Sequence, residues 1–282
     1  MKHQGTSPLT EQERQQQELL AKALKKIPEK PEESLRHKWP EGYDLYDALC
    51  KLRNILDAPG RFLYSDISTL REGNFYLLGH NPDVDLNENP KLSDEIRKWS
   101  AKSKNAFLDE SWENRPDGEY TIQKRVQELC KYVVDKDLDL DTSTRQVCAS
   151  NLFFGRSKSA TTLAERDPES FWPVHRAVLD IVQPVCILAI GAGKNKDNTY
   201  RIVKDLLGFS DIKDIIFPSG HENCSCFVVE GHYQSKRLNQ QIKLIGVPDF
   251  SRFVLDIQAL EWIAKECRKS VTKSRRNASK HP

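Results

Sequence analysis

Long uninterrupted apolar runs are scarce in this chain of 282 residues. The longest one in its central region extends only from Val185 to Ile190, and a membrane-spanning helix needs roughly 20 apolar residues. The beginning of the chain, MKHQGTSPLTEQERQQQELL, has no apolar core of the kind found in a secretory signal peptide. We therefore expect a cytoplasmic protein with no membrane partner.

The chain also lacks an excess of charge of one sign and a cysteine framework. Lys and Arg total 43 and Asp and Glu total 41, a net charge of +2, which excludes a histone-like polycation and by itself predicts no nucleic-acid partner. The cysteines number seven, and three of them lie in or beside apolar runs. An odd number in such positions indicates reduced thiols rather than disulfides.

Complete phosphate-binding or metal-binding motifs are missing as well. Gly191–Lys194 resembles part of a P-loop, but the earlier glycine is absent and Asn195 replaces Ser or Thr. Asp135–Asp141 lacks the glycine and the bidentate glutamate of a calcium loop. We therefore expect no metal and no cofactor. A few possible zinc ligands occur without the usual spacing: His221, Cys224, Cys226 and His232.

Short apolar runs alternate with segments of helix length along the middle of the chain. The runs, read as strands, are residues 75–79, 146–152, 185–191, 224–230 and 242–246. The intervening and closing segments, read as helices, are residues 93–107, 121–134, 173–182, 200–207 and 253–267. This alternation predicts an α/β fold, with a central, mostly parallel sheet of four to five strands flanked by helices.

Composition divides the chain into three parts. Residues 1–38 are rich in Gln, Glu and Lys and are expected to form a helical or mobile N-terminal extension. Residues 39–264 contain all the predicted strands and form the α/β domain. Residues 265–282 carry many basic side chains and one acid, Glu266. This basic tail is either a solvated, disordered end or an arm that follows phosphates.

Three of the predicted strands end in unusual polar turns, which are Gly79–Asp83, Asn151–Ser157 and Gly246–Phe253. Ligands of open α/β sheets bind at the carboxyl ends of the strands, so these turns are candidates to share one site. Each one, taken singly, is also explained by ordinary turn chemistry, because Asn-Pro and Pro-Asp are common in loops.

The order of these motifs resembles the uracil-DNA glycosylase superfamily. Gly79–Pro82 is similar to the family's first motif, Asn151 is similar to its base-reading Asn, and Pro248–Arg252 resembles its late motif. The resemblance covers roughly residues 70–262. It implies a uracil-DNA-glycosylase-like sheet and a glycosylase activity in residues 39–264. The late motif departs from the family because Asp249 stands where the family has His.

The resemblance assigns roles to the residues of the three turns. Asn81 would orient the attacking water, and Asp249 would act beside the leaving base only with a raised pKa. The expected substrate-binding residues are Gly79, His80, Asp83, Asp85, Asn151, Phe153 and Phe154. Asn151 has one acceptor and two donors for the polar edge of a pyrimidine. Phe153 or Phe154 would stack on the flipped base, or pack in the core.

Hydroxyl and basic side chains follow the same turns and are expected to contact DNA phosphates. These DNA-binding candidates are Arg156, Ser157, Lys158, Phe250, Ser251 and Arg252. Phe250 would wedge into the base stack left by flipping, and a packed core position is the alternative. His80 and His221 are candidates to replace the missing histidine at Asp249, or are ordinary loop histidines.

The residue after the first motif suggests which base is removed. Uracil-specific members place a bulky Tyr there, whereas this chain has Asp83, with Asp85 nearby. Carboxylates accept hydrogen bonds from sugar hydroxyls, which favours a bulky 5-substituted cytosine, such as glucosylated hydroxymethylcytosine in phage DNA. We expect a monomer that acts on double-stranded DNA. The alternatives are a uracil or mismatch repair glycosylase, a non-catalytic nucleic-acid-binding module on the same fold, and an unrelated nucleotide-processing α/β enzyme.

Overall fold

The computed structural model describes Ala48, Leu52 and residues 59–80, 91–94, 104–155, 167–193, 198–219, 224–235 and 238–278, with side chains up to residue 271. Six strands form one mixed sheet in the order β2-β1-β3-β6-β5-β4. Their bounds are β1 Phe75–Gly79, β2 Cys148–Asn151, β3 Cys186–Ile190, β4 Ile215–Pro218, β5 Ser225–Gln234 and β6 Asn239–Val247. The first four strands in this order, β2, β1, β3 and β6, are parallel to one another, and β5 is antiparallel to both of its neighbours, β6 and β4.

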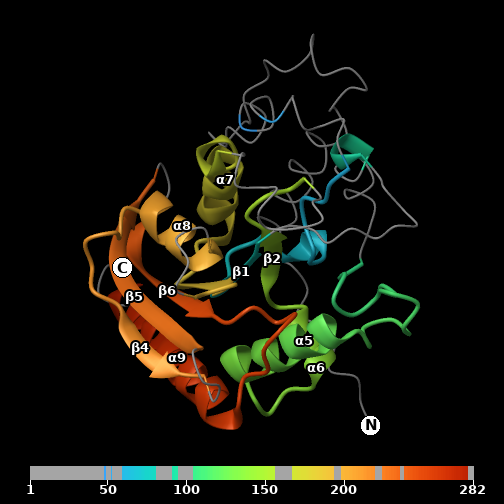
Figure 1. Ribbon diagram of the computed structural model, residues 1–282. Helices are drawn as coiled ribbons and strands as arrows, with labels where there is room; N and C mark the ends of the chain where they lie inside the picture. Colours follow the sequence, from blue (N-terminus) through green and yellow to red (C-terminus); the bar gives the residue numbers. More distant parts are fainter. Residues whose placement is uncertain are drawn as a thin grey trace.

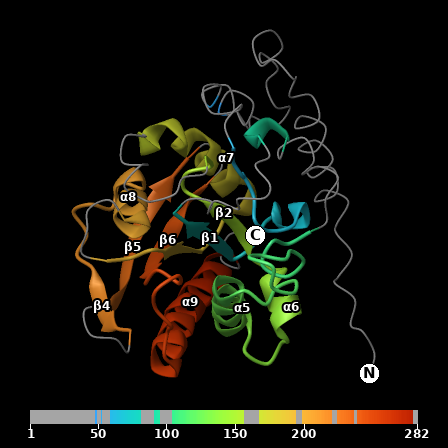
Figure 2. The same ribbon diagram turned by 45° about the vertical axis from the view of Figure 1, so that its right-hand side comes forward.

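Helices cover both faces of this sheet (Figures 1 and 2). On one face lie α7 (Trp172–Val182) and α8 (Thr199–Leu206), and on the other lie α5 (Thr121–Val134) and α9 (Ile257–Ala278). The remaining helical elements are the short α6 (Leu140–Thr144) and the 3-10 turns η1 (Ile67–Thr69) and η3 (Pro168–Ser170). The predicted α/β class, with a sheet flanked by helices, is confirmed.

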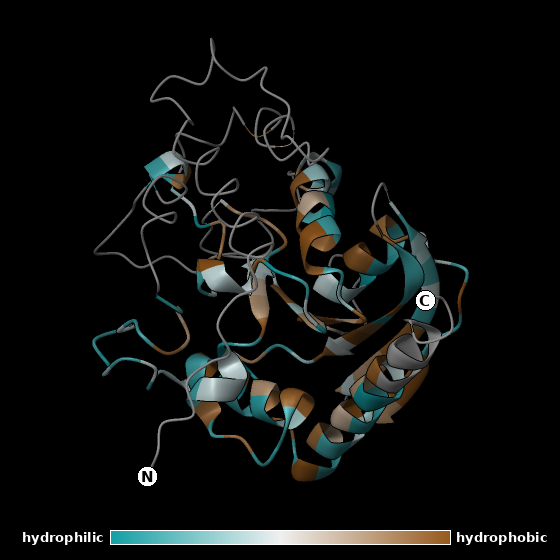
Figure 3. Cartoon of the chain, turned by 180° about the vertical axis from the view of Figure 1, so that it is seen from behind, coloured by the Kyte–Doolittle hydropathy of each residue, from teal (hydrophilic) through white to brown (hydrophobic). Residues whose placement is uncertain are grey.

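The alternation of side chains along each strand creates two hydrophobic cores. In β1, Tyr76 and Leu78 pack toward α7, whereas Phe75 and Leu77 pack on the α5 and α9 side. The sheet centre is apolar on both faces, which is why its strands read as continuous hydrophobic runs. Helix α9 carries apolar and polar residues in turn (Figure 3), and its apolar face is buried.

The sheet differs from the prediction at its outer edge. The prediction of four to five strands is wrong because β4 adds a sixth strand, antiparallel to β5. Ile215 and Ile216 of β4 are exposed, so this short strand has neither the buried run nor the apolar-polar alternation by which a strand is recognised.

Two of the predicted helices, residues 93–107 and 253–267, also have wrong boundaries. Residues 104–107 lie in loop and turn structure rather than at the end of a helix, because Asp109 Oδ2 accepts the N–H of Asn105, and Asn105 Oδ1 accepts that of Phe107. The last helix spans Ile257–Ala278 instead of residues 253–267, so residues 265–278 of the predicted basic tail are helical rather than a disordered end. Asp256 Oδ1 accepts the N–H of Ala259 at 2.7 Å, which is the bond of an N-capping residue.

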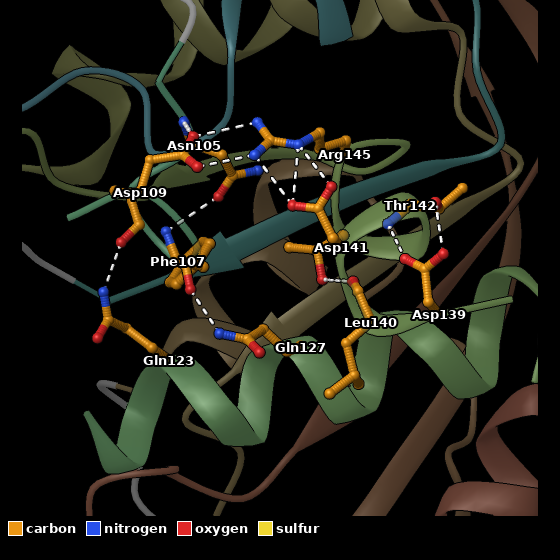
Figure 4. A network of polar contacts seen from close by, with 12 residues as sticks. Asn105, Phe107, Asp109, Gln123, Gln127, Asp139, Leu140, Asp141, Thr142 and Arg145 are labelled. Carbon is orange, nitrogen blue, oxygen red and sulfur yellow. Dashed lines mark hydrogen bonds and ion pairs between the residues drawn. The ribbon is translucent and has the colours of Figure 1, made fainter. Parts of the chain in front are cut away.

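A polar network fixes the loop before α5 (Figure 4). The guanidinium of Arg145 donates to Asp109, with Nη2 2.7 Å from Oδ1, and also pairs with Asp141. The buried Gln127 amide donates to the carbonyls of Phe107 and Gly118. These bonds hold a loop that is rich in backbone polar groups against the first turns of α5.

Candidate functional site

The strand ends that carry the predicted motifs form a row across one edge of the sheet. Gly79 of β1 is in register with Asn151 of β2, and Leu78 is in register with Ala189 of β3. One residue further, Ile190 pairs with Val247 of β6. With about 4.8 Å between neighbouring strands, β2 and β6 are separated by roughly 14 Å at this edge.

Asn151 and Gly79 form the tightest contact in this row. A Cβ added to Gly79 would lie 2.0 Å from Oδ1 of Asn151, so the amide group lies directly against the glycine and any larger residue would displace it. Asn151 is only 7% exposed. No residue of the described part of the chain is hydrogen-bonded to its side chain. The amide atoms of Asn151 are not among the fully enclosed, unpartnered polar atoms of the described residues, so they remain open to water or a ligand.

Residues 60–65, a segment that precedes β1, pair with the outer edge of β2 and with the turn that follows β2. Tyr64 N–H donates to the carbonyl of Ala149 at 2.9 Å, and Arg61 N–H donates to that of Phe154 at 2.8 Å. Gly60 passes so close that a Cβ there would lie 2.6 Å from the Phe154 oxygen. The segment thereby satisfies backbone groups that an edge strand would leave open.

Phe153 and Phe154 are both buried. Phe154 contacts Phe62, Phe171 and the ring of His175, so its ring is part of the core, the alternative that the sequence left open. Phe153 packs edge-to-face on His80, with ring centroids 5.3 Å apart. In this structure neither ring offers an exposed face for stacking on a base.

His80 is held at the point where the strand order of the sheet reverses. Nδ1 of its ring lies 3.1 Å from Oγ1 of Thr199, which is the first residue of α8 and is buried. Gly191, at the end of β3, has a φ of +100° and comes so near that a Cβ would lie 3.2 Å from the same oxygen. The crevice between β1 and β3 is where open α/β sheets bind ligands.

Asp249 stabilises its own turn after β6. Oδ1 accepts the N–H of Ser251 at 2.8 Å, and Oδ2 lies 3.8 Å from Nε of Arg252. The side chains of Asp249 and Arg252 are 46% and 77% exposed, and Ser251 is exposed too. These three residues are accessible to a polyanion, but the turn lies on the far side of the row from Asn151.

Phe250 differs from the predicted wedge. It is 1% exposed and lies in the core on the α5 and α9 side. Its carbonyl accepts a hydrogen bond from Nη1 of Arg125. The wedge interpretation is therefore wrong in this structure, and the packed core position describes the residue.

Several predicted site residues lie outside the described residues. They are Asn81, Asp83, Asp85, Arg156, Ser157 and Lys158, together with His221.

A buried hydrogen-bonded pair that sequence reasoning missed lies behind the Asn151 turn. The hydroxyl of Tyr76 in β1 is 2.9 Å from Nδ1 of His175 in α7, and Nε2 of the same ring is 3.0 Å from the Leu152 carbonyl. Burial raises the pKa of Tyr76 well above its usual value and lowers the pKa of His175 to about 4. The one available signal was a histidine within the apolar run of α7.

Possible metal ligands are not gathered in the described parts of the chain, where no group of three His, Cys, Asp or Glu side chains is placed to hold an ion. His232 is hydrogen-bonded to Asn239 instead. All six described cysteines are free thiols. None of the helices in these same parts has the length and apolar character to cross a membrane.

Comparison of the chain with models of protein families gives no match, and comparison with curated protein sequences gives none either. The class of protein that the fold defines is thus an α/β domain with a candidate ligand site at the carboxyl edge of its parallel strands.

Proposed function

We propose that the chain is a monofunctional DNA glycosylase, which hydrolyses the N-glycosidic bond of a modified pyrimidine flipped out of double-stranded DNA. The observation that carries the proposal is the largely buried Asn151 side chain against Gly79, whose amide has no hydrogen-bond partner among the described residues. Its acceptor and two donors match the polar edge of a pyrimidine. Its place at the last residue of β2, beside the end of β1, is the expected position of a ligand-reading side chain in such a sheet.

The reaction breaks the bond between the sugar C1′ and the base nitrogen, and water supplies the oxygen that C1′ gains. The electron pair of that bond leaves with the base, and the proton released from water finally resides on the base or in solvent. Asn81 directly follows His80 and is the candidate to orient the water, although it lies outside the described residues. Donors such as the Asn151 amide would stabilise the negative charge on the departing base.

We further propose that the base is a bulky 5-substituted cytosine, such as the glucosylated hydroxymethylcytosine of phage DNA. The resulting abasic sites would disable the invading genome. Asp83 and Asp85 support this proposal through the motif alone, since both lie outside the described residues. Replacing both by Ala should reduce action on the sugar-bearing base selectively, and an equal loss on every substrate would refute their assignment to the sugar.

The test incubates the protein with uracil-containing DNA, unmodified DNA and DNA bearing glucosylated hydroxymethylcytosine, followed by alkaline cleavage at abasic sites. Cleavage confined to the glucosylated DNA, and lost in Asn151→Ala and Asn81→Ala, is the expected result. Cleavage at uracil alone would assign the chain to repair. Binding to DNA without cleavage would support a non-catalytic module, and a preference for free nucleotides would favour a nucleotide-processing enzyme.

A further inference from the structure

His175 is a buried titratable group that is hydrogen-bonded to Leu152, the residue after Asn151. It is fully buried in α7, and its ring lies 5.0 Å from that of Phe154 and 5.9 Å from that of Trp172. Both ring nitrogens have hydrogen-bond partners, the Leu152 carbonyl and the Tyr76 hydroxyl. Buried ring nitrogens need such partners, and here one of them is the residue that directly follows Asn151, which links α7 to the candidate site.

The partners determine which nitrogen carries the proton. A carbonyl oxygen only accepts, so Nε2 must donate to Leu152, and in a neutral ring Nδ1 must then accept from the Tyr76 hydroxyl. The titratable groups that face the ring are Tyr76 from β1 and, beyond its hydroxyl, Cys148 from β2. Neither supplies a negative charge at neutral pH that would favour an imidazolium, because burial raises the pKa of both.

Leu152 directly follows Asn151, and both its N–H and its carbonyl are hydrogen-bonded. Its N–H donates to the Gly79 carbonyl at 2.9 Å, and its own carbonyl accepts from His175 at 3.0 Å. The next residue continues the pattern, since Phe153 N–H donates to the carbonyl of His80 at 3.0 Å. The peptide group between Asn151 and Leu152 is thereby fixed from the β1 side, and the peptide group between Leu152 and Phe153 is fixed from the α7 side.

We propose that His175 is a positioning residue for Asn151, and that it acts as the neutral Nε2–H tautomer, which the Leu152 carbonyl selects and the Tyr76 hydroxyl completes by donating to Nδ1. This inference rests on the proposed function for its effect on base excision. The geometric part, control of the Asn151 amide through the Leu152 carbonyl, concerns the protein alone. His175 contacts no substrate in this proposal.

Two substitutions of His175 test whether the hydrogen bond to the Leu152 carbonyl matters, as distinct from the volume of the imidazole ring. In His175→Gln, the amide nitrogen is as many bonds from Cα as Nε2 and can still donate to the Leu152 carbonyl. In His175→Asn, the amide nitrogen corresponds to Nδ1 and falls short of that carbonyl. We expect His175→Asn to lower kcat about tenfold with little change in KM, the effect of one hydrogen bond, and His175→Gln to restore most of the loss. Tyr76→Phe should lower kcat as well, since it leaves Nδ1 of the buried His175 ring without its donor.

A second readout does not depend on catalysis. In full-length protein labelled with ¹⁵N, the imidazole shifts of His175 should report a protonated Nε2 and an unprotonated Nδ1. The side-chain amide signal of Asn151 should move in His175→Asn and stay near its wild-type position in His175→Gln. Thermal unfolding of each variant shows whether a loss reflects unfolding instead.

The two claims fail in different ways. If the wild-type protein excises no base from any DNA of the panel, the proposed function fails, and the Asn151 amide signals alone decide the positioning role. If His175→Gln and His175→Asn have equal effects on that signal, or the ring carries its proton on Nδ1, the positioning role is refuted even when excision is robust.

Discussion

At the scale of single residues, Gly79 shows how strictly the site depends on one missing side chain. A methyl group there would overlap Oδ1 of Asn151 at 2.0 Å. We predict that Gly79→Ala displaces the Asn151 amide, abolishes base excision and destabilises the fold by about 2 kcal/mol, as measured by excision assays and urea denaturation. Gly73→Ala is the matched control, because its new methyl group would meet no atom nearer than 3.7 Å. Equal behaviour of the two variants would contradict the contact.

His175 makes stability depend on pH. Burial lowers its pKa from 6.5 to about 4, so the unfolded chain binds a proton between these values and the folded chain does not. The stabilisation is complete above pH 6.5, is lost as the pH falls toward 4, and amounts to on the order of 3 kcal/mol. Urea denaturation at stepped pH should show this decline in wild type. The His175→Gln variant should show a smaller decline, and identical pH profiles would contradict the assignment.

The residues of the site differ in how far the sequence could reveal them. Gly79 and Asn151 belong to short motifs that end predicted strands, and these can be found without coordinates. Tyr76 and His175 are 99 residues apart, and His80 and Thr199 are 119 residues apart. Their roles arise from contacts between elements, which no local pattern encodes. For the same reason the sequence left two positions open for Phe250, since the pattern around an apolar residue in a turn does not tell whether its side chain packs into the core.

At the scale of elements, Arg145 ties the loop before α5 to the end of α6. Burial alone would raise the pKa of Asp109, but the hydrogen bonds and charge of Arg145 hold it below its ordinary value, so this stabilisation is lost as the pH falls through the lowered pKa. We predict that Arg145→Gln destabilises the fold by about 2 kcal/mol in urea denaturation. Arg252→Gln, which alters an exposed pair at 3.8 Å, should change stability by less than about 0.5 kcal/mol. Similar effects of the two would contradict a structural role for this network.

Helices and strands were predicted more accurately where their residues are buried than where they are exposed. Strand β1 and helix α5 have the bounds that their patterns predict, because β1 is apolar throughout and Gln123 Oε1 accepts the Tyr120 N–H at the start of α5. Strand β4 was missed because it pairs at the sheet edge with both faces exposed. Strand pairing at an edge is decided by the neighbouring strand, not by local hydrophobicity.

At the scale of the whole molecule, α9 is joined to the sheet by a buried ion pair. Lys243 of β6 places Nζ 2.9 Å from Oε2 of Glu266, and the side chains are only 4% and 10% exposed. Removing Lys243 leaves the enclosed Glu266 carboxylate with only the exposed Lys269 as an ion-pair partner. We predict that Lys243→Met costs about 3 kcal/mol in stability, whereas Lys124→Met, in an exposed pair with Glu119, costs less than about 1 kcal/mol. Comparable losses in thermal and urea unfolding would show that this pair does not anchor α9.

The same architecture places the candidate site away from this anchor, at the carboxyl edge where β2, β1, β3 and β6 end in register. The most direct measurement of the central claim is mass spectrometry of the base released from glucosylated and uracil-containing DNA, by wild type and by Asn151→Ala. Free glucosylated hydroxymethylcytosine released by wild type, and reduced at least a hundredfold in the variant, is the predicted result. Undiminished release by Asn151→Ala, or no released base from either DNA, would contradict a base-reading role for the amide that lies against Gly79.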